Sequence, residues 1–87
     1  MNTFRLKIST PDGNVFDGQT AKLDLRGVGG ELAVMAGHIP FMTAVKPGVC
    51  RVMDGDGSVR RGSSDGGLLN VSADGTTLLV GCFTWDE

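Results

Sequence analysis

The sequence predicts an all-β fold, a two-layer antiparallel β-sandwich of about ten short strands. Polar and apolar residues alternate along several segments, most clearly in residues 3–10, where Phe4, Leu6 and Ile8 share one face. Glycine supplies 14 of the 87 residues, and six of these glycines follow an aspartate, a pair typical of tight hairpin turns. No window shows apolar residues at the spacing of an amphipathic helix.

The strands expected from this pattern are short and follow one another closely. They cover residues 3–10, 15–16, 20–26, 32–35, 41–45, 49–53, 58–61, 67–72 and 76–85. Turns are expected at the Asp-Gly pairs that begin at Asp12, Asp17, Asp54, Asp56, Asp65 and Asp74. Adjacent leucines such as Leu68 and Leu69 put apolar side chains on both faces of a strand, which favours two sheets packed face to face.

Length and charge restrict the function classes. A chain of 87 residues has room for one domain, residues 1–87. Eight basic and ten acidic residues leave a net charge of −2, so we expect no nucleic-acid partner. No apolar run approaches the ~20 residues of a membrane-spanning helix, and the first residues lack the apolar stretch of a signal peptide. We therefore expect no direct membrane insertion.

The two cysteines, Cys50 and Cys82, are fewer than the roughly four to eight of a small secreted scaffold. We expect both thiols to be reduced and buried, because a free cysteine packs as a small hydrophobe. A single structural disulfide is the alternative.

No arrangement of residues in the sequence matches a known active site or metal site. His38 is the only histidine, and the sequence lacks the G-x-S-x-G elbow of a serine hydrolase. Cys50 and Cys82 lack metal-ligand spacing, and residues 54–58 lack the glutamate and helices of a calcium loop. Residues 27–31 lack the third glycine of a dinucleotide motif, and a strand follows them. These absences predict a non-catalytic binding or assembly module with no cofactor and no metal.

Residues 30–48 read GELAVMAGHIPFMTAVKPG. This stretch resembles the signature of the epsilon subunit of the F-type ATP synthase, in which G-E, G-H-x-P, a threonine and K-P-G recur at fixed spacing. All nine fixed positions are met, by Gly30, Glu31, Gly37, His38, Pro40, Thr43, Lys46, Pro47 and Gly48. The resemblance extends to the opening strand and to residues 66–71, so it covers essentially the whole chain.

The resemblance implies a ten-stranded β-sandwich and a role in the central stalk of the enzyme. Such a rotor subunit binds the gamma subunit, stands on the polar loops of the c-ring, and couples proton flow to ATP synthesis without catalysing a reaction itself. It lies peripherally on the cytoplasmic face of the energy-transducing membrane. Family members usually continue into a pair of inhibitory C-terminal helices, which the 87 residues do not include. The inhibitory and ATP-binding functions are therefore not carried over, and a naturally short subunit and a chain cut at the domain boundary both stay open.

The resemblance also implies an interface with gamma and the c-ring. We expect Glu31 to meet basic side chains near the ring, and His38 to lie near gamma and the ring. The glycines either allow close backbone approach or only form turns. The expected interface residues are Gly29, Gly30, Glu31, Gly37, His38 and Thr43.

A second function class is a free-standing β-sandwich adaptor or carbohydrate-binding module. Sugar rings stack on exposed aromatic side chains, and this sequence has four phenylalanines, one tryptophan and no tyrosine. Trp85 is the one candidate for such stacking.

Overall fold

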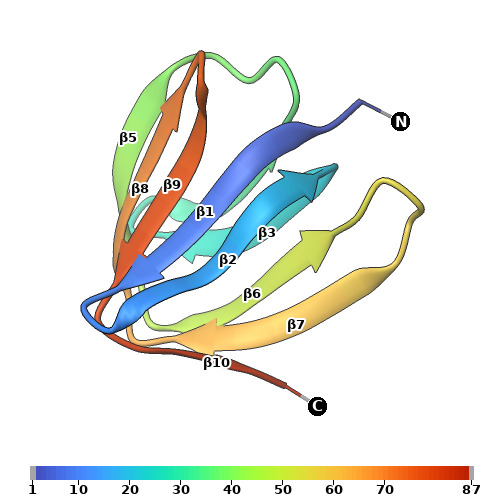
Figure 1. Cartoon of the computed structure of the whole chain (residues 1–87). Helices are drawn as coiled ribbons and strands as arrows, with labels where there is room; N and C mark the ends of the chain where they lie inside the picture. The colour runs from blue at the N-terminus through green and yellow to red at the C-terminus, as the bar shows by residue number, and fades with distance from the viewer. Residues whose placement is uncertain (1, 87) are drawn as a thin grey trace.

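The computed structural model describes residues 2–86, which form ten β-strands and no helix (Figure 1). The part of the chain described here thus holds no helix that could cross a membrane. The strands are β1 (Phe4–Thr10), β2 (Gly13–Thr20), β3 (Lys22–Gly27), β4 (Gly30–Met35), β5 (Phe41–Val45), β6 (Gly48–Met53), β7 (Val59–Ser64), β8 (Gly67–Ser72), β9 (Gly75–Val80) and β10 (Phe83–Trp85). The all-β prediction is confirmed, and the strand count agrees with it.

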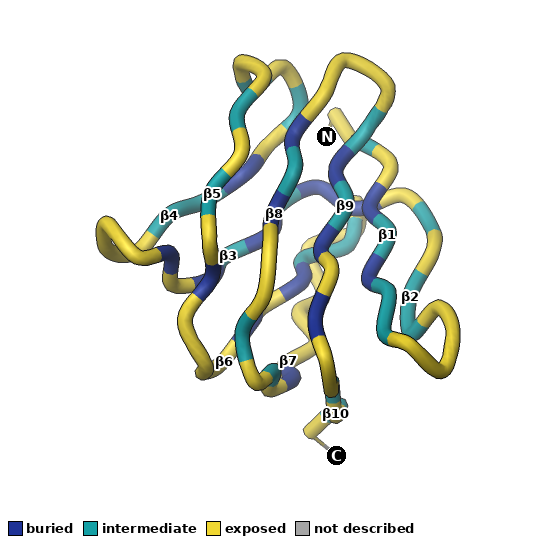
Figure 2. Tube along the Cα trace, turned by 90° about the vertical axis from the view of Figure 1, so that its left-hand side faces the viewer, coloured by how far each residue is buried: buried dark blue, intermediate teal, exposed yellow. Residues whose placement is uncertain are grey.

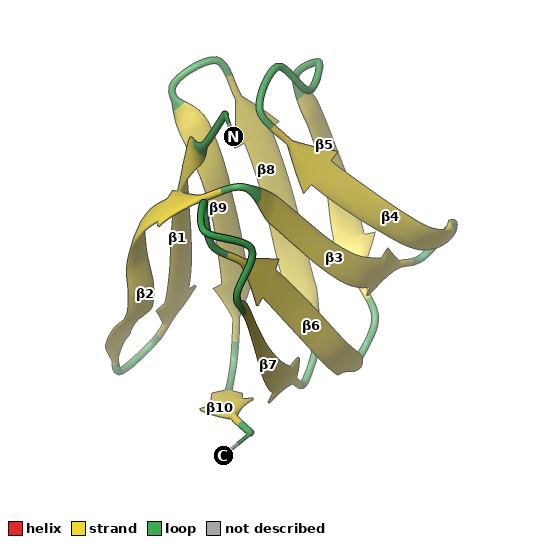
Figure 3. Cartoon of the chain, turned by 90° about the vertical axis from the view of Figure 1, so that its right-hand side faces the viewer, coloured by secondary structure: helices red, strands yellow, loops and turns green. Residues whose placement is uncertain are grey.

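The ten strands form one continuous sheet that folds into two layers (Figure 3). One layer has the order β10-β7-β6-β3, with β4 on the far side of β3, and the other has the order β5-β8-β9-β1-β2. The layers are joined where Gly27 at the end of β3 pairs with Val45 at the end of β5. Strand β1 runs parallel to β9, and the other pairs are antiparallel. The predicted β-sandwich is therefore a nearly closed sheet.

The chain passes from one layer to the other between β2 and β3, at Thr20 and Ala21. The Thr20 hydroxyl donates a hydrogen bond to the Met53 carbonyl at 2.6 Å, and the Ala21 amide donates to the same oxygen at 2.7 Å. Thr20 is fully buried, and its bond to Met53 satisfies the hydroxyl. This crossing ties the start of β3 to the end of β6.

The hydrophobic core lies between the two layers (Figure 2). It is built from the alternate, inward-facing positions of seven strands, as period-two patterning requires. Its buried members are Leu6, Ile8, Leu23, Leu25, Val34, Val45, Cys50, Val52, Leu69, Val71, Leu78 and Val80. The residues between them point outward, so Leu68 is 38% exposed while its neighbour Leu69 is completely buried.

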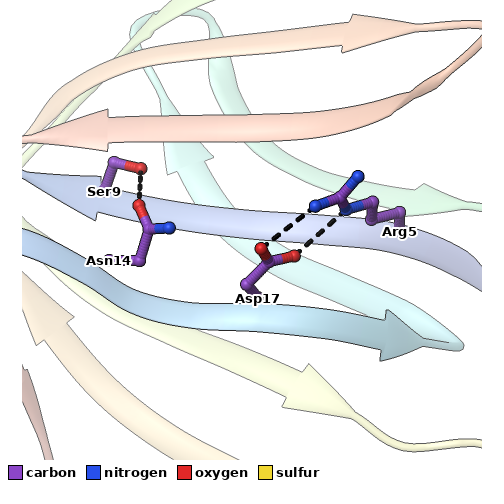
Figure 4. Close-up of polar contacts among 4 residues, drawn as sticks. All are labelled: Arg5, Ser9, Asn14 and Asp17. Carbon is purple, nitrogen blue, oxygen red and sulfur yellow. Dashed lines mark hydrogen bonds and ion pairs between the residues drawn. The ribbon is translucent and has the colours of Figure 1, made fainter.

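Strand β2 lies at the outer edge of its layer, and polar side chains link it to β1. The Arg5 guanidinium binds the Asp17 carboxylate through two hydrogen bonds of 3.0 and 3.1 Å, and Ser9 donates to Asn14 (Figure 4). The bond from Arg5 holds the pKa of the Asp17 carboxyl below its ordinary value. Near Ile8 and Ser9, the register between the two strands shifts by a bulge.

The turn expected at Asp17-Gly18 was wrong, because β2 runs through these residues. Gly18 pairs with Leu6 and has no positive φ, so its backbone is that of an ordinary strand. Asp17 pairs with Lys7 in the same ladder. The Asp-Gly pair signals a turn only where the flanking strands reverse, and here the reversal is at residues 11–12.

The single strand expected over residues 76–85 is divided into β9 and β10. The break lies at Gly81 and Cys82, whose amides both donate to one carboxylate oxygen of Asp65, at 3.0 and 2.9 Å. The Asp65 amide in turn donates to the Cys82 carbonyl. Because β9 pairs with β8 and β10 pairs with β7, the chain changes layer at this break.

The expectation that both cysteines are buried was half wrong. Cys50 faces the core of the sandwich and is 1% exposed, and burial raises the pKa of its thiol. Cys82 is exposed, because it lies in the break between two strands rather than within one. Both are free thiols.

We predict that Leu69→Ala lowers the free energy of unfolding by ~2–5 kcal/mol, because it opens a cavity between the layers. The adjacent Leu68→Ala is the matched control and should cost about 1 kcal/mol or less, since Leu68 faces outward. Urea denaturation of both variants measures the difference. Equal losses would contradict the assignment of the two faces of β8.

We predict that a maleimide reagent labels Cys82 quickly in the folded protein and Cys50 only on unfolding. Burial shields the Cys50 thiol and disfavours its thiolate, which is the reactive form. Mass spectrometry of labelled Cys82→Ser and Cys50→Ser variants would separate the two rates. Fast labelling of the Cys82→Ser variant under native conditions would contradict the burial of Cys50.

Candidate functional site

Five of the six predicted interface residues lie at the two ends of β4. Gly29, Gly30 and Glu31 lie at the hairpin between β3 and β4, and Gly37 and His38 follow the far end of the strand. Strand residues rise about 3.3 Å each, so a strand of this length spans roughly 17 Å. The structure therefore does not bring Glu31 and His38 together, and the signature forms two separate surfaces.

Glu31 lies beside a wide groove on the outer face of β3, β4 and β6. The groove has a volume of about 650 Å³, and its polar lining includes Asp24, Arg26, Glu31 and Arg51. Arg26 is directly opposite Glu31 in the β3–β4 ladder, and Asp24 is opposite Arg51 in the β3–β6 ladder. Within residues 2–86 the Glu31 carboxylate forms no ion pair, so it is available to a cation from outside.

The sequence predictions missed Arg26 and Arg51 as neighbours of Glu31. A two-residue turn at Val28 and Gly29 pairs Gly27 with Gly30 and therefore Arg26 with Glu31. The glycines that flank the two-residue turn were the sequence signal for this register. Arg51 comes near only because β6 pairs with β3 across a gap of more than twenty residues in sequence, which no local signal reports.

Backbone conformation explains two of the three signature glycines at the ends of β4. Gly30 has φ +126° and Gly37 has φ +83°, a region that residues with a Cβ rarely adopt. Gly29 has no positive φ, and a Cβ built on it meets no atom within 4 Å. Turn geometry is thus a sufficient reason for glycine at positions 30 and 37, and neither geometry nor internal crowding requires it at position 29.

His38 lies in the loop between β4 and β5 and is half-buried. Its Nδ1 is 2.7 Å from the Ile39 carbonyl oxygen, which can only accept, so Nδ1 bears a proton, and in the neutral ring Nε2 is then the acceptor. The ring packs edge-on against Phe41, with the ring centroids 5.8 Å apart. A cleft of about 340 Å³ beside the ring reaches the β8–β9 turn at Asp74.

Thr43 lies in the middle of β5, away from both ends of β4. It pairs with Leu69 and therefore shares the inner face of the sheet with that core residue. Its hydroxyl donates to the Ala44 carbonyl at 3.3 Å. Thr43 is half-buried, so it presents less surface to a partner than Glu31 does.

An apolar row crosses the outer face of β5, β8 and β9, and the sequence predictions did not single it out. Leu68 lies directly opposite Ala44 on β5 and Leu79 on β9, and all three are exposed. Met42, two residues before Ala44 on the same face of β5, is 62% exposed. Ile39, in the loop that leads into β5, is 74% exposed. The adjacent leucines of β8 were the available signal, since one of two neighbours in a strand must point outward.

The other candidate sites, the loop at Asp56 and the ring of Trp85, make contacts within the chain itself. In the loop between β6 and β7, the amide and hydroxyl of Ser58 both donate to Asp56, which lowers the pKa of the Asp56 carboxyl. No group of three or more metal-ligating side chains occurs in the residues described. Trp85 is half-buried; Phe16 and Phe83 pack edge-on against it, and the Arg60 guanidinium lies 3.9 Å from its ring centroid. It is not an open stacking platform for a sugar.

Comparison with known proteins identifies the family of this chain. Residues 3–86 match the model of the ATP synthase delta/epsilon chain β-sandwich domain. The chain is 35% identical over 85 residues to the sodium-ion-specific ATP synthase epsilon chain of Acetobacterium woodii, covering 98% of this chain and 64% of that protein. The chain thus spans less than two thirds of that relative's length.

Two solved structures have the same fold. A chain of the mitochondrial ATP synthase of Euglena gracilis, solved as an OSCP/F1/c-ring assembly, matches 95% of this chain and 53% of its own length, with a TM-score of 0.89 and 21% identity. A chain of the Tetrahymena thermophila mitochondrial ATP synthase, solved as central stalk and c-ring, matches 91% of this chain and 63% of its own, with a TM-score of 0.73 and 17% identity. The family match and the sequence relative together lead to one conclusion: the chain belongs to the β-sandwich family of ATP synthase delta and epsilon chains.

Proposed function

We propose that this chain is a non-catalytic subunit of the central stalk of an F-type ATP synthase, linking the gamma subunit to the c-ring. In this role it couples proton flow through the ring to ATP synthesis by transmitting torque. The observation that most supports the proposal is the position of the signature residues at opposite ends of one strand, β4. Two separate surfaces on a rigid sandwich suit a subunit that must hold two partners in fixed geometry.

The surface proposed for gamma is the His38 end of β4 together with the apolar row on the outer face of β5, β8 and β9. Permanent interfaces are more apolar than the rest of a protein surface, and Met42, Leu68 and Leu79 form such a row. In the neutral ring, Nε2 of His38 offers an acceptor at this end of β4. Ile39, which is 74% exposed, follows His38 in the loop that leads into β5.

The surface proposed for the c-ring is the groove around Glu31. Its lining mixes acidic and basic side chains, which fits the polar loops of a ring better than an apolar partner. The unpaired carboxylate of Glu31 would bind a lysine or arginine of the ring. Arg26 and Arg51 would in turn face acidic side chains of the same loops.

The proposed location is the cytoplasmic face of the energy-transducing membrane, where the subunit is held peripherally by its partners. The chain would reach the membrane through the c-ring, without inserting into the bilayer itself. A free-standing adaptor is the alternative function, and the apolar row alone would be compatible with it. Co-purification decides between them: gamma and the c-ring should be retained on the tagged chain, and an adaptor would retain neither.

We predict that Glu31→Gln weakens binding to the c-ring by only ~0.2–1 kcal/mol, because ion pairs at a wet interface contribute little. The loss should be larger at low salt, where screening is weaker. Isothermal calorimetry against detergent-solubilised ring at two ionic strengths measures it, with Asp12→Asn, in the remote β1–β2 turn, as the control. A loss independent of salt would contradict the ion pair.

We predict that His38→Ala weakens binding to gamma by ~1–2 kcal/mol, because the interface loses an acceptor and a packed ring together. The thermal midpoint should hardly change, since His38 lies in a loop outside the core. If instead His38→Ala lowers stability as much as Leu69→Ala and leaves binding intact, His38 is a structural residue.

A further inference from the structure

The sheet of ten strands is almost closed, and its two end strands are β2 and β10. Within residues 2–86, no main-chain hydrogen bond joins these two strands. An aromatic contact joins them instead, since the rings of Phe16 on β2 and Trp85 on β10 meet edge to face with their centroids 6.1 Å apart. In this part of the chain, the seam between β2 and β10 is therefore closed by side chains alone.

Strand β10 has few bonds to the rest of the sheet. It is the shortest of the ten strands described, with three residues, and among these strands only β7 pairs with it (Figure 1). After Trp85, the Asp86 amide donates to the Arg61 carbonyl at 2.8 Å, and an exposed ion pair joins the same two side chains at 3.4 Å. An element with few buried contacts and exposed hydrogen bonds opens at a low free energy.

The chain just before β10 is fixed in place. One carboxylate oxygen of Asp65 accepts hydrogen bonds from the amides of Gly81 and Cys82. The Asp65 amide donates to the Cys82 carbonyl at 3.3 Å. These three bonds hold the chain where it passes from β9 to β10, so residues 83–86 can swing away from β7 while residues 81–82 stay in place.

The aromatic rings of β10 cover a position on the inner face of β7 that has no side chain. Gly62 pairs with Trp85 on one side and with Cys50 on the other. A Cβ built on Gly62 would lie 2.6 Å from the Phe83 ring, so the ring occupies the space of the missing side chain. Without the rings of β10, the inner face would be open beside the buried Cys50 thiol.

We propose that β10 is a strap that closes the seam of the sandwich through Trp85 and opens on its own while the nine other strands stay folded. Opening moves Phe83 and Trp85 off β7 and uncovers the core at Gly62 and Cys50. The contact with Phe16 holds the strap closed, so a residue of the first hairpin stabilises the last strand. The inference does not depend on the proposed function.

Hydrogen exchange of the Thr84 and Asp86 amides tests the separate opening. The Asp86 amide bonds to β7, and the alternation of an antiparallel ladder turns the Thr84 amide the same way. Both should exchange at least a hundredfold faster than the amide of Leu78, whose strand β9 pairs with β8 and β1. Equal rates for the three amides would overturn the inference, because β10 would then open only with the whole chain.

A matched pair of variants separates a strap from the ordinary fraying of a chain end. Phe16→Leu removes the ring that meets Trp85 and should speed exchange of the Thr84 and Asp86 amides at least fivefold. Phe41→Leu is the control and should leave both rates unchanged, because Phe41 is also half-buried against the core but lies on β5, at the other end of that layer. Rates that ignore Phe16→Leu, or that rise equally in both variants, would overturn the inference.

Labelling with a maleimide, in a Cys82→Ser background, tests whether the strap covers Cys50. Local unfolding of β10 is then the route to this thiol, so Trp85→Ala should speed its labelling at least tenfold in a chain that circular dichroism shows to be folded. Thr84→Ala is the control and should change nothing, since Thr84 faces outward. Phe16→Leu should speed labelling by the same factor as it speeds exchange of the Thr84 amide, which decides the matter even if Trp85→Ala does not fold. Labelling of Cys50 that stays as slow as with the unaltered strap would overturn the inference.

Discussion

Strand β3 pairs with three other strands, and the arrangement of both layers follows from this. Along its first half it is bonded to β6, at its last residue to β5, and along its whole length on the other side to β4. The single pair between Gly27 and Val45 is where the sheet turns from one layer into the other. Because β6 and β5 occupy one side of β3, β4 is left at the outside with a free edge.

A glycine, Gly27, lies at this corner. A Cβ built on Gly27 would approach a methyl group of Leu32 to 2.9 Å, so a larger residue would require the Leu32 side chain to shift, whereas the Ala44 carbonyl oxygen, at 3.5 Å, would be in ordinary van der Waals contact. A stronger constraint acts at the neighbouring residue of the corner, because a Cβ on Gly66 would lie 2.6 Å from the carbonyl oxygen of Val45, which pairs with Gly27. Gly66 also has φ +92°, and it lies in the connection from β7 to β8, where the chain passes between the layers.

Period-two alternation was enough to predict the class of the fold and most of its core, because most inward positions of the strands have an apolar residue. It could not predict where strands change layer. Asp17-Gly18 has the composition of a turn but pairs with β1, and residues 81–82 contain no Asp-Gly pair but form a break bonded to Asp65. These outcomes depend on partners far away in the sequence, which local patterns do not contain.

In the candidate site, too, the features set by local sequence were predictable, and those that depend on distant strand pairing were not. The signature stretch indicated Glu31 and His38, and the hairpin register would have added Arg26. The groove beside Glu31 needs β6, and the apolar row needs β5, β8 and β9 side by side, so neither was predictable from its own segment.

The parallel pair between β1 and β9 has a consequence for the order in which the molecule forms. Leu6 pairs with Thr76, so the first strand meets this partner only after about seventy further residues have been synthesised. A hairpin of β1 and β2 can form as soon as it leaves the ribosome, yet one of its edges stays open until β9 arrives. Contacts of such long sequence separation slow folding. Closure of the barrel-like sheet is therefore a late event, and the N-terminal hairpin spends the longest time exposed to wrong partners.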